Sequence, residues 1–133
     1  MTDEQRMQIG EVADRTGLSL RTIRHYEEVG LVVPSARTKG GFRLYTAADV
    51  DRLMVIRRMK PLDFSLEEMR DLLSITDRLA SDQPPQGAER ERLRERLDTY
   101  RKIADARCET LRAQLMAAED FAATLRRRLG PQG

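Results

Sequence analysis

Hydrophobic residues recur every three or four positions in two short runs near the start of the chain, IGEVADRTG at 9–17 and LRTIRHYEEVG at 20–30. This spacing predicts two amphipathic helices. Gly17 is a stop signal for the first helix, Ser19 is a natural N-cap for the second, and Gly30 ends it. Two short helices joined by a three-residue turn form a helix-turn-helix.

The second of these helices has one apolar face and one face rich in hydrogen-bond donors. We expect Leu20, Ile23 and part of Tyr26 to be buried against the first helix. The donors on the outer face are Arg21, Thr22, Arg24 and His25. Such a face suits the DNA major groove, where Arg reads guanine edges and Thr or His reaches bases and phosphates. Many short helix pairs bind nothing, so this pattern alone leaves the function open.

The segment SARTKGGFRLYT at 35–46 predicts a β-hairpin, which would form a wing beside the helix-turn-helix. Gly40 and Gly41 can supply the positive φ angles of its turn, and the flanking RTK and FRLY form its strands.

The second strand of this hairpin alternates between two faces. Arg43 and Tyr45 share one face, and Phe42 and Leu44 share the other. One pair must face the core, and the alternation does not decide which.

Two capping boxes predict two further helices. Thr46, with Asp49 three positions later, opens a helix that Pro61 ends. Val50, Leu53 and Met54 recur in it at helical spacing, and Arg57 continues the same spacing.

The second box joins Ser65 to Glu68 and opens a helix that we expect to run to about Ile75. Phe64 and Met69 are placed to form its hydrophobic staple.

A long apolar stripe follows a polar break. Pro84 and Pro85 interrupt any helix between 79 and 87, and the segment 88–129 contains neither Gly nor Pro. The stripe consists of Leu93, Leu97, Tyr100, Ala104, Cys108, Leu111, Leu115, Ala118, Ala122, Leu125 and Leu129. Its steps follow a heptad pattern with one four-residue insertion around Cys108. One helix cannot bury this stripe alone, so we expect it to pair with a second copy.

The pattern therefore predicts a mainly α protein with three parts. Residues 1–78 form a winged helix-turn-helix domain, 79–87 a linker, and 88–133 a dimerisation helix with a short tail.

Composition supports an oligomer and narrows the chemistry. Charged residues make up 35% of the 133 positions and Trp is absent, which argues against one large core. The single Cys excludes an intramolecular disulfide and a Cys-based zinc site, so we expect no metal and no cofactor. One His, one Cys and no Gly-rich phosphate loop leave no catalytic constellation, so we expect no enzyme. No apolar run is long enough to span a membrane and the start resembles no signal peptide, so we expect a cytoplasmic protein.

Positive charge is concentrated in the first half of the chain. Residues 15–62 hold ten Lys or Arg against four acids, a local balance of +6. A compact basic segment is typical of proteins that bind phosphates, although a solvated charged face gives the same count. The basic residues are Arg15, Arg21, Arg24, Arg37, Lys39, Arg43, Arg52, Arg57, Arg58 and Lys60.

Three segments, IGEVADRTGLSLRTIRHYEEVGLV, GGFRLYTAADVDRLMVIRRMK and FSLEEMRDLL, resemble the DNA-binding domain of the MerR family of bacterial transcription regulators. The resemblance covers roughly residues 8–75. It implies a homodimer with an antiparallel coiled coil that binds an inverted repeat in promoter DNA and distorts it, with RNA polymerase as a possible further partner. The bound protein would either activate or repress transcription.

The resemblance also implies which residues contact DNA. On the recognition helix and its cap these are Ser19, Arg21, Thr22, Arg24, His25 and Tyr26, and on the wing Arg37, Lys39, Phe42 and Arg43. Arg57 either meets a flanking phosphate or merely solvates its helix. The chain departs from the family pattern at Phe42, where a Tyr is common, and at Asp63, where a Gly is common.

Cys108 has two interpretations. As a seam residue it is a small apolar filler. The midpoint of 88–129 is 108.5, however, so full antiparallel overlap would bring Cys108 near its copy and permit a reversible disulfide. From the residues up to Gly133 we expect neither the effector domain of drug-sensing members of the resembled family nor the cysteines of metal-sensing ones.

Two other functions fit the same residues. An architectural or excisionase-like DNA binder would share the winged helix, and a coiled-coil interaction protein would bind DNA weakly and without sequence preference. Sequence preference in DNA binding separates these alternatives from a transcription regulator.

Overall fold

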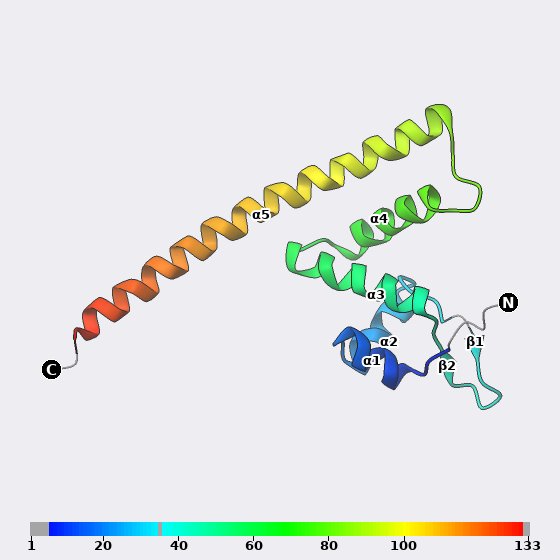
Figure 1. Ribbon diagram of the computed structural model, residues 1–133, viewed down its shortest axis with the longest axis horizontal. Coiled ribbons are helices and arrows are strands. Elements are labelled where there is room, and N and C mark those ends of the chain that lie inside the picture. Colours follow the sequence, from blue (N-terminus) through cyan, green and yellow to red (C-terminus); the bar gives the residue numbers. More distant parts are fainter. Residues whose placement is uncertain (1–5, 35, 132–133) are drawn as a thin grey trace. The chain divides into compact units, whose positions relative to one another are not determined.

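The computed structural model describes residues 6–34 and 36–131, and the chain divides into two compact units between Asp77 and Arg78. The protein is mainly α, as predicted (Figure 1). The elements are α1 (Ile9–Thr16), α2 (Leu20–Glu28), β1 (Ala36–Arg37), β2 (Arg43–Leu44), α3 (Ala47–Met59), the 3₁₀ helix η1 (Lys60–Leu62), α4 (Leu66–Leu79) and α5 (Gly87–Leu129).

Helices α1 and α2 form the predicted helix-turn-helix. Gly17 ends α1 in the left-handed conformation with φ of 73°, and the Ser19 hydroxyl caps α2 by accepting the Thr22 amide at 3.0 Å. The buried Thr16 hydroxyl donates to the Val12 carbonyl at 2.9 Å and accepts from the Leu18 amide at 3.2 Å. The turn between the helices is thereby fixed from both sides.

Two details of α2 differ from the prediction. The helix ends at Glu28, two residues before Gly30. Leu20 is 41% exposed, whereas Ile23 and Tyr26 are buried as the core face of the helix. Side chains of a helix point back toward its N-terminus, so the side chain of the first residue projects beyond the packed turns.

The wing is a hairpin with shorter strands than predicted. Strand β1 pairs antiparallel with β2, matching Ala36 with Leu44 and Arg37 with Arg43. Of the two turn glycines, only Gly41 has a positive φ, at 84°. Beyond β2, the Tyr45 and Met7 backbones exchange hydrogen bonds at 2.7 Å, which ties the hairpin to the start of the described chain.

Helix α3 begins with the complete capping box of Thr46 and Asp49. The fully buried positions of α3 are Leu53, Ile56 and Met59. Of the residues that recur at helical spacing, Leu53 is buried, Val50 and Met54 are half-buried and Arg57 is exposed. Apolar residues occur almost all round this helix, so the packing of the domain selects the face that periodicity leaves ambiguous.

Pro61 lies inside η1, which continues α3 by one tight turn. The turn ends at Asp63, which has φ of 61°, the one positive φ of a non-glycine residue in the described ranges. Left-handed backbone costs an L-residue about 1–2 kcal/mol, with Asp and Asn tolerating it best. Asp63 thus occupies a position whose conformation glycine adopts without strain.

We expect Asp63→Gly to raise the free energy of unfolding by less than about 1 kcal/mol, because relief of strain exceeds the entropic cost of Gly. Asp63→Val should lower it by about 1–2 kcal/mol, because a β-branched side chain is strained at positive φ. Urea unfolding of the three proteins measures the order. A Val variant as stable as the wild type would contradict this account of the turn.

Helix α4 starts with the predicted capping box, in which Ser65 and Glu68 exchange hydrogen bonds at 2.9 and 3.1 Å. Phe64 and Met69, the expected staple, are both buried. The helix continues to Leu79, four residues beyond the predicted end at Ile75.

Helix α5 runs unbroken over 43 residues. Along its apolar stripe Leu93 is buried, Leu97, Tyr100 and Cys108 are half-buried, and the second half is bare. The bare large residues of this half are Leu111, Leu115, Met116, Phe121, Leu125 and Leu129. No helix in the described part of the chain is long and apolar enough to cross a membrane.

Candidate nucleic-acid interface

The outer face of α2 is open to solvent and basic. Arg21, Arg24, His25 and Glu28 line a shallow hollow of about 570 Å³. Neither Arg21 nor Arg24 forms an ion pair with another described residue, so both guanidinium groups are available to an incoming anion. The donor-rich face that the sequence predicts is therefore present on one side of the helix.

Ser19 and Thr22 border this face at the start of α2. The Ser19 hydroxyl donates to Thr22 Oγ1 at 2.8 Å while it caps the helix. Both hydroxyls lie at the surface beside the N-terminal end of α2, where backbone amides and the helix dipole favour anions.

Tyr26 does not belong to this surface. Its side chain is only 2% exposed, and its hydroxyl is buried. Tyr26 follows Ile23 by three positions and so shares its inward face. The expectation that Tyr26 contacts DNA is corrected, and the residue is assigned to the core.

The wing is joined to α2 through Glu27. Arg43 Nε donates to Glu27 Oε1 at 2.5 Å, the Tyr45 hydroxyl donates to Oε2 at 2.9 Å, and Arg37 Nη2 lies 3.8 Å from Oε1. The Glu27 side chain is 11% exposed, so this cluster is largely shielded from water. The hairpin face of Arg43 and Tyr45 is therefore the inward one, and we call Glu27, Arg37, Arg43 and Tyr45 the wing clamp.

The wing clamp raises the pKa of Tyr45 to about 12, because burial and the hydrogen bond to the Glu27 carboxylate both oppose the phenolate. The folded protein thus retains the phenol proton at pH values where the unfolded chain has lost it. We expect the free energy of unfolding to fall as pH rises from 10 to 12. Urea titrations across this window, with Tyr45→Phe as control, measure the slope, and an equal slope in the control would contradict the assignment.

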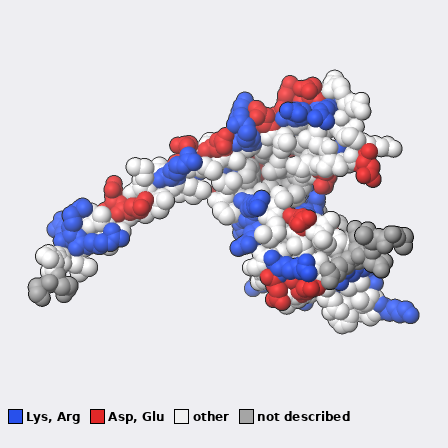
Figure 2. All heavy atoms as spheres, viewed as in Figure 1, with Lys and Arg blue, Asp and Glu red and all other residues white. Residues whose placement is uncertain are grey.

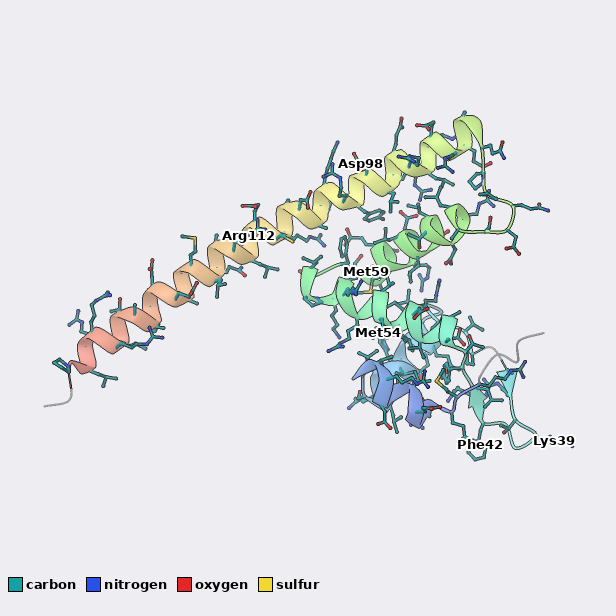
Figure 3. The ribbon with its side chains drawn as sticks, in the orientation of Figure 1. Lys39, Phe42, Met54, Met59, Asp98 and Arg112 are labelled. Carbon is teal, nitrogen blue, oxygen red and sulfur yellow. The ribbon has the colours of Figure 1, made fainter. Side chains whose placement is uncertain are left out.

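The turn end of the hairpin carries the two most projecting candidates. Figure 3 shows Lys39 and Phe42 at this tip. Phe42 is 66% exposed, and its ring lies against Gly40, where an added Cβ would come within 3.4 Å. The tip is held by the Thr38 backbone and hydroxyl, which bond Gly41 and Phe42 at 2.8–3.1 Å. A cation and a bare aromatic ring on a braced turn suit contact with a sugar-phosphate backbone.

Arg57 on α3 extends this surface on the helix-turn-helix side. Its guanidinium carbon and nitrogens lie 3.7 Å from the position of a Cβ at Gly17. The side chain thus covers the turn between α1 and α2 and remains exposed. Of the two interpretations of Arg57, this position favours a flanking phosphate.

Two arginines, Arg52 within the basic segment and Arg70 beyond it, serve the fold instead. Arg52 donates to the Leu31 carbonyl at 2.6 Å and to both oxygens of Asp77 at 2.9 Å. Arg70 donates to the Val29 carbonyl. Together they hold the loop that follows α2. A count of charges along the sequence cannot identify these structural roles of Arg52 and Arg70, or that of Glu27. Their hydrogen-bond partners lie 16 to 41 positions away in sequence.

The charge distribution differs along the molecule. Figure 2 shows Lys and Arg at the wing tip, whereas blue and red groups alternate along α5. Within α5, Arg101 bonds Asp98 at 2.7 Å and Asp105 at 2.8 Å, and these carboxylates hold the pKa of Arg101 above its usual range. Exposed pairs at this spacing stabilise a helix only modestly. The last turn of α5 differs from the rest of the helix, because Arg126, Arg127 and Arg128 make it basic.

The described residues contain no group of three or more His, Cys, Asp or Glu side chains that could hold a metal ion. Cys108 is a free, half-buried thiol on α5.

A helix-turn-helix with an exposed basic second helix and an adjoining two-stranded wing defines the winged helix-turn-helix class. The family model for the MerR HTH family regulatory protein matches residues 7–75, and the model for the MerR DNA-binding region matches residues 50–118. The chain belongs to the MerR family.

Two curated proteins are similar to this chain in sequence. The mercuric resistance operon regulatory protein of Bacillus cereus is 45% identical over 73 residues, covering 55% of this chain and 55% of its own. The nodulation protein NolA of Bradyrhizobium sp. (strain NC92) is 36% identical over 135 residues, covering 96% of this chain and 56% of its own. The chain spans about half the length of these relatives.

Two solved structures share the fold. MtaN, the N-terminal part of the Bacillus subtilis multidrug transporter activator, is 28% identical, with a TM-score of 0.53 over 94% of this chain and 99% of its own. HiNmlR, a MerR family regulator lacking the sensor domain and crystallised on promoter DNA, gives a TM-score of 0.68 at 22% identity, over 87% of this chain and 80% of its own.

Proposed function

We propose that this protein is a sequence-specific transcription regulator that binds an inverted repeat in promoter DNA as a homodimer and distorts the DNA between the half-sites. The observation that carries this proposal is the exposed basic face of α2, with Arg21 and Arg24 unpaired among the described residues and the wing clamped beside it. Membership of the MerR family supports the same activity.

In this mechanism the two parts of the surface have different tasks. Arg21, Thr22 and Arg24 present donors to base edges in the major groove. Lys39 and Arg57 contact phosphates and supply affinity that depends on salt but not on sequence. Phe42 packs its ring on the sugar-phosphate backbone. It donates no hydrogen bond there, because it lacks the hydroxyl that a Tyr would offer.

Two copies are required because one helix reads only one half-site. A twofold protein matches an inverted repeat, and the dimer axis then coincides with the axis of the DNA site. The bare apolar stripe on α5 supports pairing with a second copy. RNA polymerase bound at the same promoter is the proposed downstream partner, in the bacterial cytoplasm.

A pair of variants tests the division of tasks. We expect Arg21→Ala to weaken binding to the native site by about 1–3 kcal/mol for each of the two half-sites and to leave scrambled DNA nearly unaffected. Lys39→Ala should weaken both duplexes equally and reduce the salt slope by about two, one for each copy. Fluorescence anisotropy across a salt series measures both effects. Lys39 is the cleaner phosphate probe, since the Arg43 guanidinium is held by Glu27.

Equal losses for Arg21→Ala on native and scrambled DNA would refute base reading by α2. That result would favour the architectural alternative, in which affinity comes from the phosphate backbone alone.

A further inference from the structure

The apolar stripe of α5 is nearly symmetric about Leu111. Next to Leu111 the match is incomplete, because Cys108 pairs with Gln114 and Leu115 with Arg107, but positions at 7, 11, 14 and 18 residues on either side are all apolar. These matched positions are Ala104 with Ala118, Tyr100 with Ala122, Leu97 with Leu125, and Leu93 with Leu129. A helix that packs against a reversed copy of itself needs this symmetry, whereas a parallel in-register pair does not.

The insertion near Cys108 is what makes the stripe symmetric. Before the insertion, the stripe follows one heptad frame through Leu97, Tyr100 and Ala104. Alternating steps of three and four residues continue this first frame from Ala104 to residue 111. The second frame, traced backward from Leu129, also reaches residue 111. Leu111 thus belongs to both heptad frames. In an antiparallel pair centred on Leu111, the first frame of each helix packs against the second frame of the other helix.

The two halves of the apolar stripe on α5 also differ in solvent exposure. The first half of the stripe is buried or half-buried within one chain, and the second half is bare, with Leu115 59%, Leu125 49% and Leu129 77% exposed. Reversal places the bare half of one helix along the first half of the other. It also brings Phe121, which is 64% exposed, beside Ile103 of the second copy.

We infer that the antiparallel pair of α5 helices, which the family resemblance already implies, forms in one register with the twofold axis at Leu111. This inference rests on the homodimer proposed above and adds its register. Arg101 and Glu119 flank the stripe on the same side, so each Arg101 approaches Glu119 of the second copy. The charge pair occurs twice by symmetry.

The competing register lies one heptad away, with the axis beside Cys108. It also matches apolar positions near the axis. However, it sets Leu125 opposite Arg90 and Leu129 opposite Gln86, and so leaves the two bare leucines at the end of α5 without apolar partners. The register centred on Leu111 sets one leucine of the stripe, Leu115, opposite a charged residue, Arg107, whereas the competing register strands two. Apolar burial therefore favours the register centred on Leu111.

The two registers predict opposite outcomes for a disulfide between the two Cys108 residues. With the axis at Leu111, the two Cys108 positions are displaced by six residues, or about 9 Å along the helices. Disulfides require Cα separations below about 7 Å, so the native thiols do not form one. Cys108 then packs at the seam as a small apolar residue, and the disulfide expected from the midpoint of the helix does not form.

Cysteine trapping distinguishes the registers. The wild type, with Cys108 alone, is compared with Leu111→Cys in a Cys108→Ser background under mild oxidation, and covalent dimer is quantified on non-reducing gels. A third protein, Leu97→Cys with Leu125→Cys in the same background, reports the ends of the interface. We expect covalent dimer from the Leu111→Cys and Leu97→Cys/Leu125→Cys proteins, and at least tenfold less from the wild type.

Sedimentation equilibrium of the Cys108→Ser protein is measured in parallel. A noncovalent dimer that is trapped through Cys108 but not through position 111 would overturn the register and leave the proposed homodimer intact. A monomer at micromolar concentration would overturn the homodimer itself.

Discussion

Replacing Glu27 with Ala is expected to lower the free energy of unfolding by about 2–3 kcal/mol, because it removes one carboxylate that serves several partners. Arg43 and the Tyr45 hydroxyl would both lose their acceptor in a shielded site. Glu27→Gln should cost less, since the amide oxygen still accepts from Tyr45. Urea unfolding followed by circular dichroism measures both changes.

The neighbouring Glu28 is a matched control. It is exposed on the same helix, so Glu28→Ala should change stability by less than about 0.5 kcal/mol. The Glu27 variants should also weaken DNA binding at temperatures where they remain folded, since the wing is no longer held beside α2. Equal stability of the Glu27→Ala and Glu28→Ala proteins would show that the wing clamp contributes nothing.

Replacing Leu125 with Glu is expected to abolish dimerisation at micromolar concentration, because Leu125 packs against Leu97 of the second copy. The substitution places a carboxylate in the apolar seam, and twofold symmetry imposes its cost of several kcal/mol on both sides of the interface. Binding to an inverted repeat should fall by at least a hundredfold, because a monomer holds one half-site only. Sedimentation equilibrium and fluorescence anisotropy measure the two effects.

Ala113→Glu provides the control for Leu125→Glu, because residue 113 lies on the side of α5 opposite the apolar stripe and is exposed. It adds the same charge outside the stripe and should leave the dimer and DNA binding intact. Disruption by both variants would indicate that added negative charge, and not loss of the seam, weakens assembly.

Local sequence signals predict much of this fold. The caps at Ser19, Thr46 and Ser65 were predicted correctly because each depends on residues three positions apart. The long helix was predicted to within one residue at its start, since nothing between 88 and 129 interrupts helical backbone. The family resemblance further supplied the order of the winged domain.

The features that sequence could not predict depend on distant contacts. Glu27 counted only as an acid within a basic segment, yet it meets Arg43 and Tyr45 across 16 and 18 positions. Tyr26 looked available for DNA because an aromatic residue with a hydroxyl suits either a core or an interface. In α3 the choice of the buried face follows from packing, because apolar residues occupy more than one side.

Sequence-specific DNA binding is tested by a salt titration of the fully reduced wild-type protein. Its affinity for DNA from upstream of its own gene is compared with its affinity for a scrambled duplex of equal length. We predict a preference of at least a hundredfold for the native DNA at 150 mM salt, a steep salt slope for both duplexes, and a stoichiometry of two chains per site. Equal affinity for the two duplexes, repeated on a genome-derived selection of fragments, would contradict a sequence-specific regulator.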